Sequence, residues 1–249
     1  MRATVHGAME DAATNTHGAV ADLLGRDSGV RRVLDIPCGE GAFLARLVAG
    51  GYLAHGADIQ SILKISDVPF TSADMNRPLP FADGSFDAVA CIEGIEHIER
   101  PFDFVRECHR ILRPDGVLLV TTPNISALRS RWRWLLTGFH NKGKTPLDET
   151  DPNPRHHIGL RSFPDLRYLL HSNGFRIAVI TTNRVKAVSW LYLVLWPLAW
   201  LATWWVFRRE VEDPAQRRRD AAVHRQLHSL PVAFGEILIV KATRSENPR

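Results

Sequence analysis

Glycines and carboxylates follow the first predicted strand in a pattern that suits a nucleotide-type cofactor. Residues 33–36 form a short apolar run, and Asp35 is followed by Gly39 and Gly41 before a helical pattern begins. Glycines let the backbone approach a ligand closely, and helix-terminal N–H groups favour a carboxylate or phosphate. Asp58 lies about 20 residues beyond the loop, where an acidic side chain commonly binds ribose hydroxyls. The alternative is that these glycines only form a tight turn.

This loop needs a strand before it and a helix after it, and the rest of the chain repeats that alternation. Apolar runs predict strands at 33–36, 52–59, 86–92, 117–122, 175–182 and 234–242. Helical patterns predict helices at 8–25, 43–48, 101–112 and 162–173. Apolar strands that alternate with amphipathic helices are typical of a parallel sheet covered on both faces. We therefore expect an α/β fold.

Composition excludes several classes of protein. The chain has 249 residues, of which 45% are hydrophobic and 23% charged, as in globular domains rather than disordered or fibrous chains. A net charge of +4 is too small to indicate nucleic-acid binding without a clustered patch. The cysteines Cys38, Cys91 and Cys108 are widely spaced, so neither a disulfide framework nor a metal site is predicted, and a cytoplasmic location is expected. The N-terminus has no apolar region typical of a secretion signal.

Several segments further along the chain follow the order and spacing of a known family. They are residues 33–41, Asp58, Asp74-Met75, 80–87, 91–97 and 112–116. Over residues 30–183, with a last strand at 234–242, the chain resembles the class I S-adenosylmethionine-dependent methyltransferases. The resemblance implies one domain over residues 1–249 with a seven-stranded, doubly wound, Rossmann-like sheet. Residues 125–161 would then be an insert on the substrate side, and 186–231 an apolar and basic insertion between the last two strands.

The resemblance also implies that S-adenosylmethionine is the cofactor and assigns residues to its methionine part. Gly39 and Gly41 would lie beneath that part, and Asp35 would organise the loop and the amino group. Glu93 and the backbone of Gly94 would line the cofactor at the end of strand 86–92.

The ribose and adenine would be held by residues from two other segments. Asp58 would accept hydrogen bonds from the ribose hydroxyls, with Ile59 beside it. Asp74 would face the adenine amino group, with the backbone of Met75 next to it. Pro37 stands where the family has its first loop glycine, and because proline fixes φ and removes an N–H, we expect a stiffer loop that still binds the cofactor.

Histidines are the candidate catalytic residues. A hydroxyl acceptor of a methyl group benefits from a base with a pKa near 7. The candidates are His97, His156 and His157, with His140 in the same insert as the last two. The alternative is that His97 packs locally and that the neighbouring pair is solvated. Glu96 is a weaker candidate because an unperturbed carboxylate is too acidic, and no cysteine accompanies the histidines at zinc-ligand spacing.

Residues 187–207 form an uncharged run that is long enough to cross a bilayer, which takes about 20 residues. The strands before and after it belong to one sheet, so both flanks stay on the same side of a membrane. Pro197 lies at its centre, where it would break a helix, so we expect a shallow hairpin or an interfacial helix. The tryptophans of the run suit the headgroup region. The alternatives are a buried core helix and a dimer interface.

Basic residues adjoin this run and could contact anionic lipid: Lys186, Arg208, Arg209 and 217–219. The basic and aromatic segment 129–134 could be a second membrane contact, could bind a phosphorylated substrate, or could be a solvated helix.

The predicted function is methyl transfer from S-adenosylmethionine, at oxygen, to a lipid-linked or glycan-type acceptor at the cytoplasmic face of the membrane. The residues 36–41 and 91–97 resemble those of methyltransferases encoded among bacterial surface-polysaccharide enzymes, which favours a sugar acceptor. A quinone or other small-molecule methyltransferase is an alternative, because Ile95-Glu96-His97 also resembles the quinone group. A non-catalytic membrane adaptor on the same scaffold is the alternative from another class. No nucleic-acid partner is expected, and a homodimer is possible.

Overall fold

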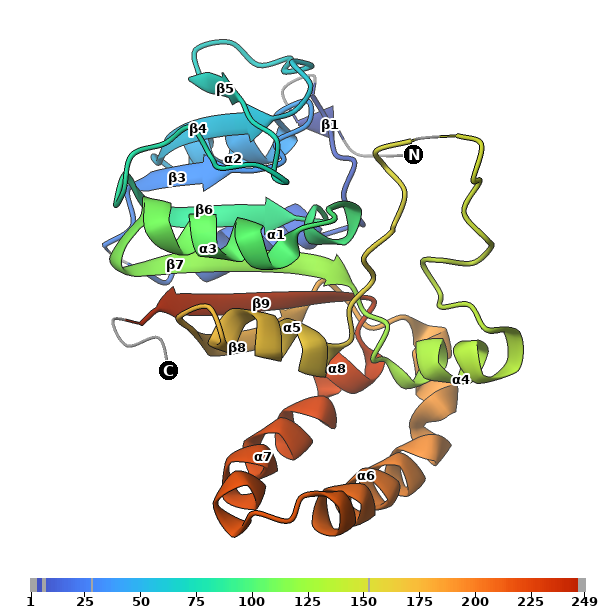
Figure 1. Cartoon of the computed structure of the whole chain (residues 1–249). Coiled ribbons are helices and arrows are strands. Elements are labelled where there is room, and N and C mark those ends of the chain that lie inside the picture. The colour runs from blue at the N-terminus through green and yellow to red at the C-terminus, as the bar shows by residue number, and fades with distance from the viewer. Residues whose placement is uncertain (1–3, 6–7, 28, 152, 246–249) are drawn as a thin grey trace.

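The computed structural model describes residues 4–5, 8–27, 29–151 and 153–245, and its main feature is a seven-stranded sheet (Figure 1). The strand order is β5-β4-β3-β6-β7-β9-β8. The strands are β3 (Arg32–Asp35), β4 (Leu53–Asp58), β5 (Phe70–Ser72), β6 (Phe86–Ile92), β7 (Leu112–Pro123), β8 (Phe175–Thr182) and β9 (Ile237–Arg244). The predicted α/β fold with seven strands is confirmed. Two short strands near the N-terminus, β1 (Thr4–Val5) and β2 (Ala8–Met9), pair with each other in a separate antiparallel ribbon.

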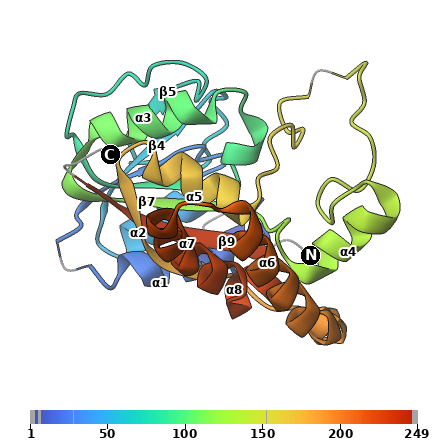
Figure 2. The ribbon, with the colours of Figure 1, turned by 60° about the horizontal axis from the view of Figure 1, so that its bottom comes forward.

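Helices cover both faces of the sheet (Figures 1 and 2). The helices α3 (Pro101–Ile111) and α5 (Phe163–His171) pack on one face, and α1 (Thr16–Leu24) and α2 (Ala42–Ala49) pack on the other. Successive residues of β3 and β6 contribute to opposite hydrophobic clusters, as strands buried on both sides must. The sheet thus divides the core into two layers. The helix predicted at 8–25 begins only at Thr16, because its first residues form β2.

One strand runs against the others, so the expectation of an all-parallel sheet is wrong at β9. This strand pairs antiparallel with both β7 and β8. After β8 the chain leaves the sheet and returns at the same edge, where Val185 bridges Gly235. Because β9 starts beside the carboxyl end of β8, it must run antiparallel to β8. A strand buried on both faces has the same apolar pattern in either direction, so the pattern could not reveal this.

The segment between β8 and β9 projects from the sheet as a helical arm (Figure 1). It contains the 3₁₀ helix η2 (Ala187–Leu195) and the helices α6 (Trp196–Glu210), α7 (Pro214–Leu227) and α8 (Leu230–Phe234). Pro197 stands in the first turn of α6, where a missing N–H costs nothing. Leu195 and Trp196 both keep a right-handed helical backbone, so η2 passes directly into α6 and the chain is not broken at this proline as predicted; only the helix type changes, from 3₁₀ to α.

By length and composition the helical stretch Ala187–Glu210 could cross a membrane, and none of its most apolar part is buried in the protein. The helix α6 has no buried residue. The alternative of a core helix is therefore wrong for this chain. Tyr192, Trp196 and Ala199 pack partly against the protein, whereas most of the other large apolar side chains of the stretch are exposed.

Candidate active site

A cavity of about 410 Å³ lies at the carboxyl ends of β3, β4 and β6. This edge of a doubly wound sheet is where ligands commonly bind. The predicted residues that line it are Asp35, Gly39, Asp58, Ile59, Asp74, Met75, Glu93, Gly94, His97 and His157. The structure thus brings all of the predicted cofactor residues except Gly41, and two of the three candidate catalytic histidines, to one cavity.

The carboxylate of Asp58 is fixed by backbone donors at the end of β4. The N–H of Gly39 donates to its Oδ2 at 2.9 Å, and the N–H of Gln60 donates to its Oδ1 at 3.0 Å. Gly39 has φ +52°, and a Cβ placed on it would meet no atom within 4 Å, so the loop borders open space. The arrangement presents a positioned acceptor for hydroxyl groups next to a backbone that a ligand can approach closely.

Asp35 lies deeper, beneath the loop, with 1% of its surface exposed. Its Oδ1 has no hydrogen-bond partner among the residues that the structure describes. Burial raises the pKa of this carboxyl group well above its ordinary range, and the nearby charge of Asp58 adds to the effect. A buried carboxyl oxygen without a partner is costly, and a cationic ligand group beside it would remove that cost. The amino group of a methionine moiety has this property.

The ring of Pro37 leaves no room for a side chain at Gly94. A Cβ on Gly94 would lie 2.4 Å from Cδ of Pro37. Beside it, Glu93 has φ +46°, and its carboxylate accepts the N–H of Ala13 at 3.1 Å. Burial raises the pKa of Glu93. The end of β6 is therefore packed against the glycine loop and against the N-terminal segment.

Gly41 lies outside the cavity lining, although it belongs to the same loop. It precedes α2 with φ +95°, and a Cβ there would lie 2.6 Å from Cδ1 of Leu63 and 2.9 Å from Cγ1 of Ile65. Glycine is needed at this position for the backbone turn and for the close approach of these side chains.

The N-terminal segment also lines the cavity, which the sequence reasoning missed. Met9, Asp11, Ala12 and His17 face it. The N–H of Met9 donates to Glu40 Oε2 at 2.8 Å, which ties the segment to the glycine loop. No motif marks these residues in the sequence. Their place depends on contacts with residues some 30 or more positions away, which a local pattern does not contain.

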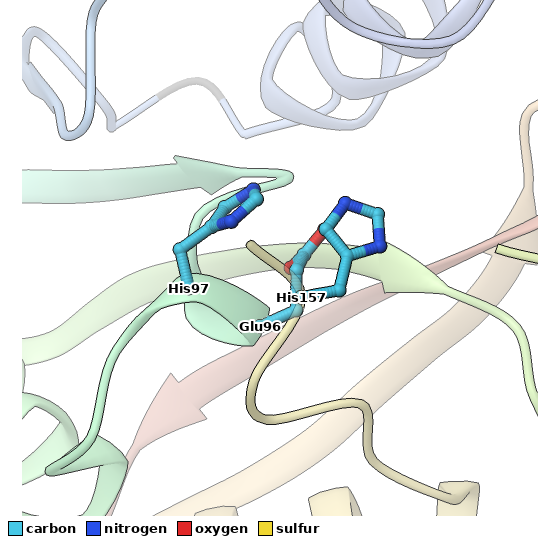
Figure 3. A group of neighbouring side chains, drawn as sticks. All are labelled: Glu96, His97 and His157. Carbon is cyan, nitrogen blue, oxygen red and sulfur yellow. The ribbon is translucent and has the colours of Figure 1, made fainter. Parts of the chain in front are cut away.

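His97 and His157 line the cavity and form a cluster with Glu96, which lies outside the lining (Figure 3). One nitrogen or oxygen atom of each lies within 4.8 Å of the others, and the two imidazole rings are 4.8 Å apart between centroids. Nδ1 of His97 donates to the backbone carbonyl of His156 at 3.0 Å. The candidate His156 does not line the cavity, and its contact with the cluster is the carbonyl that accepts from His97. His140 lies elsewhere, bonded through Nδ1 to Ser130 Oγ at 3.0 Å.

Burial controls the protonation of this cluster. It lowers the pKa of His97, and it lowers that of His157 to about 4, with the charges of His97 and Lys142 contributing to the second effect. Glu96 is fully buried, and burial raises its pKa to about 8. At neutral pH both imidazoles are therefore neutral and the carboxyl group is mostly protonated. Two imidazoles and one carboxyl group are also a donor set that could hold a divalent ion once the carboxyl is ionised.

The sequence comparisons identify the family. The profile of a methyltransferase domain family matches residues 34–120. A demethylmenaquinone methyltransferase from Beutenbergia cavernae is 31% identical over 175 residues, which are 64% of this chain and 70% of that protein. The chain belongs to the class I S-adenosylmethionine-dependent methyltransferases. S-adenosylmethionine is its cofactor, as the sequence predicted.

Other relatives of this methyltransferase match less of their own length. A ubiquinone biosynthesis O-methyltransferase from Pseudomonas aeruginosa is 29% identical over 107 residues, which are 38% of this chain and only 45% of that protein. Among solved structures, a SAM-dependent methyltransferase from Archaeoglobus fulgidus superposes with a TM-score of 0.54 at 20% identity, covering 92% of this chain and 95% of that one. At that level of identity the likeness shows the fold.

The cavity of the methyltransferase fits its cofactor. Asp35 offers a carboxyl oxygen without a partner, Gly39 borders open space, and Asp58 is held as an acceptor by two backbone donors. When bound, S-adenosylmethionine supplies an activated methyl group. The protein must then align an acceptor and exclude water from the cavity.

Proposed function

We propose that this methyltransferase methylates a hydroxyl group of a lipid-linked, glycan-type acceptor at the cytoplasmic face of the membrane. The observation that carries the chemistry is the orientation of His97. Its Nδ1 is occupied by the carbonyl of His156, so in the neutral ring Nδ1 carries the proton and Nε2 carries the lone pair. His97 lines the same cavity as the cofactor residues.

In this scheme Nε2 of His97 takes the proton of the acceptor hydroxyl as the oxygen bonds to the methyl carbon. The cofactor, when bound, would supply the methyl group and would keep the electron pair of the methyl–sulfur bond on its sulfur. The lowered pKa of His97 keeps the imidazole neutral at pH 7 and ready to accept the proton. The protonated carboxyl group of Glu96 places no full negative charge beside it at that pH.

An exposed apolar surface supports the membrane part of the proposal. We call it the apolar surface. Its residues are exposed and come from α4 (Leu128–Thr137), η2 and α6: Trp132, Trp134, Leu135, Leu136, Val188, Trp190, Leu191, Leu193, Val194, Leu198, Trp200, Leu201, Trp205 and Val206. The helix α4 packs against η2, which continues into α6. Apolar patches of this extent mark interaction sites, and tryptophans favour the membrane interface.

Basic residues beside the apolar surface favour a lipid partner over a second copy of the chain. The helix α4 carries three arginines and no acidic residue, and Arg208 and Arg209 lie in the last turn of α6. Two such positively charged surfaces would repel each other in a dimer, whereas anionic lipid attracts them. All three cysteines are unpaired, which supports a reducing compartment.

The function can be tested with methyl-labelled S-adenosylmethionine and bacterial lipid extracts. We expect label to enter the lipid-linked glycan fraction as an ether, and no transfer by the Asp58→Ala variant. Label that appears in no lipid-linked glycan would refute the proposed acceptor.

A quinone acceptor is the second candidate. The named activities of the relatives from Beutenbergia and Pseudomonas favour it, because they act on demethylmenaquinone and in ubiquinone biosynthesis. The same labelling experiment distinguishes a quinone acceptor from a lipid-linked glycan, because with a quinone acceptor the label would enter the quinone fraction. Binding of S-adenosylmethionine without transfer to any acceptor would instead favour the non-catalytic adaptor.

Membrane contact needs its own test. Leu191 and Val194 are 74% and 78% exposed, so replacing both with glutamate removes apolar contact without disturbing the core. We expect wild type to sediment with phosphatidylglycerol vesicles and the double variant to remain in solution. The matched control replaces Val48 and Leu53, which are also exposed, with glutamate. Equal sedimentation of all three proteins would contradict a lipid-facing role for this surface.

A further inference from the structure

A second cavity, of about 200 Å³, lies between α4, η2 and the carboxyl end of β7. Its charged lining residues are Arg129, Lys142, Lys144, Lys186 and Glu236. One carboxylate thus stands among four cations. The cavity is distinct from the cofactor site, with which it shares no lining residue.

The single carboxylate does not neutralise these cations. Glu236 pairs through Oε1 with Lys186 at 2.6 Å and with Lys142 at 4.0 Å, and through Oε2 with Arg184 at 2.7 Å. Arg129 and Lys144 have no side-chain hydrogen bond or ion pair within the described ranges 4–5, 8–27, 29–151 and 153–245. The cavity therefore holds an excess of positive charge, which an anion would balance.

The start of α4 adds to this preference. Its first turn contains no acidic residue, and Ala127 at its N-cap provides no side-chain acceptor. Ala127, Arg129 and Ser130 line the cavity, so the positive end of the helix dipole faces the same space as the cations. Helix N-termini with unpaired N–H groups favour phosphate.

Two connections place this cavity between the apolar surface and the cofactor site. Lys186 and Ser189 of its lining lie at the beginning of the helical arm, where η2 contributes to the apolar surface. On the other side, the N–H of Glu93, which lines the cofactor site, donates to Oγ1 of Thr121 at 2.9 Å, two residues before Pro123 of the second cavity. The charge of Lys142 also opposes the rise that burial causes in the pKa of Glu93. An acceptor anchored in the membrane and reaching the cofactor site would pass this cavity.

We propose, on the basis of the methyl transfer proposed above, that the second cavity binds the phosphate or diphosphate group of a lipid-linked acceptor. Arg129 supplies a planar donor for two phosphate oxygens, and the lysines supply point charges. The lipid chain then lies along the apolar surface, and the glycan extends toward His97. A quinone carries no phosphate, so this cavity distinguishes between the two acceptor classes.

The test is calorimetric titration of the full chain with pyrophosphate and with a short-chain prenyl diphosphate. In one variant Arg129 and Lys144 are both changed to glutamine. In the control variant the same change is made at Arg26 and Arg176, which are exposed and outside the cavity lining. Each protein is also titrated with S-adenosylmethionine, which reports on the cofactor site separately.

We expect wild type and the control to bind both diphosphates, and the Arg129/Lys144 variant to bind them about tenfold more weakly or worse, with unchanged affinity for S-adenosylmethionine. Absence of diphosphate binding by wild type, or equal binding by both variants, would overturn the anion site while leaving methyl transfer to another acceptor intact. Competition by plain phosphatidylglycerol vesicles as strong as that by prenyl diphosphate would assign the cavity to a membrane headgroup instead. Diphosphate binding at this cavity without methylation of any diphosphate-linked glycan would support the anion site and refute the proposed acceptor.

Discussion

Replacing Glu96 with glutamine should make the protein more stable, and the gain should depend on pH. Glu96 is fully buried, and its pKa is raised from an ordinary value of 4.5 to about 8. Between these values the folded state keeps a proton that the unfolded state has released, so the free energy of unfolding falls as pH rises. The slope is about 1.4 kcal/mol per pH unit, and the total loss is at most about 5 kcal/mol above pH 8. Glutamine keeps the size of the protonated side chain and does not titrate.

The assay is urea unfolding at pH values from 4.5 to 8, followed by tryptophan fluorescence, with EDTA present to remove divalent ions. The difference between Glu96→Gln and wild type should be near zero at pH 4.5 and should grow steadily toward pH 8. Other titrating groups cancel in this difference because both proteins contain them. The control is Glu99→Gln, at an exposed position in the same loop, which should follow wild type at every pH. A stability difference that does not change with pH would show that Glu96 is not held protonated by burial.

Three further outcomes follow from the site. Asp58→Ala and Gly39→Arg should each abolish S-adenosylmethionine binding in calorimetry. Asp58→Ala removes the positioned carboxylate, and Gly39→Arg fills the open space beside the loop. Unchanged affinity for S-adenosylmethionine in either variant would reject the site. His97→Ala should reduce kcat by about 10²- to 10⁴-fold with unchanged cofactor affinity. Because burial lowers the pKa of His97, the wild-type rate should rise with pH below pH 6.5 and then level off. Equal pH profiles of wild type and His97→Ala would exclude His97 as the base. Gly94→Ala should lower thermal stability by about 1–3 kcal/mol through its clash with Pro37, and adding Pro37→Gly should restore part of the loss; no loss in the single variant would contradict the packing.

Most of the residues that the sequence predicts for cofactor binding line one cavity, because the signals that mark them are local. The turn after β3 needs Gly39 for its positive φ, and Asp58 stands at the end of the next strand. Parallel strands bring their carboxyl ends to one edge of the sheet, so residues that follow different strands meet without further information. The assignment of these residues to S-adenosylmethionine came from the family resemblance, which rests on the spacing that the motifs of this chain share with the family.

The tertiary structure decided what depends on long-range contact or burial. It brought His157 from the insert beside His97, and it showed that Glu96 is buried, whereas the ordinary pKa of a carboxylate had argued against a role for that residue. It reversed β9, because only the return of the arm to the same edge of the sheet fixes the direction of that strand. It also gathered Lys142 and Lys186, distant in the chain, around one carboxylate. Local sequence patterns encode the backbone conformation of a segment and which face of a helix or strand is apolar. The charge balance and the desolvation of a side chain arise only when separate segments of the chain pack together.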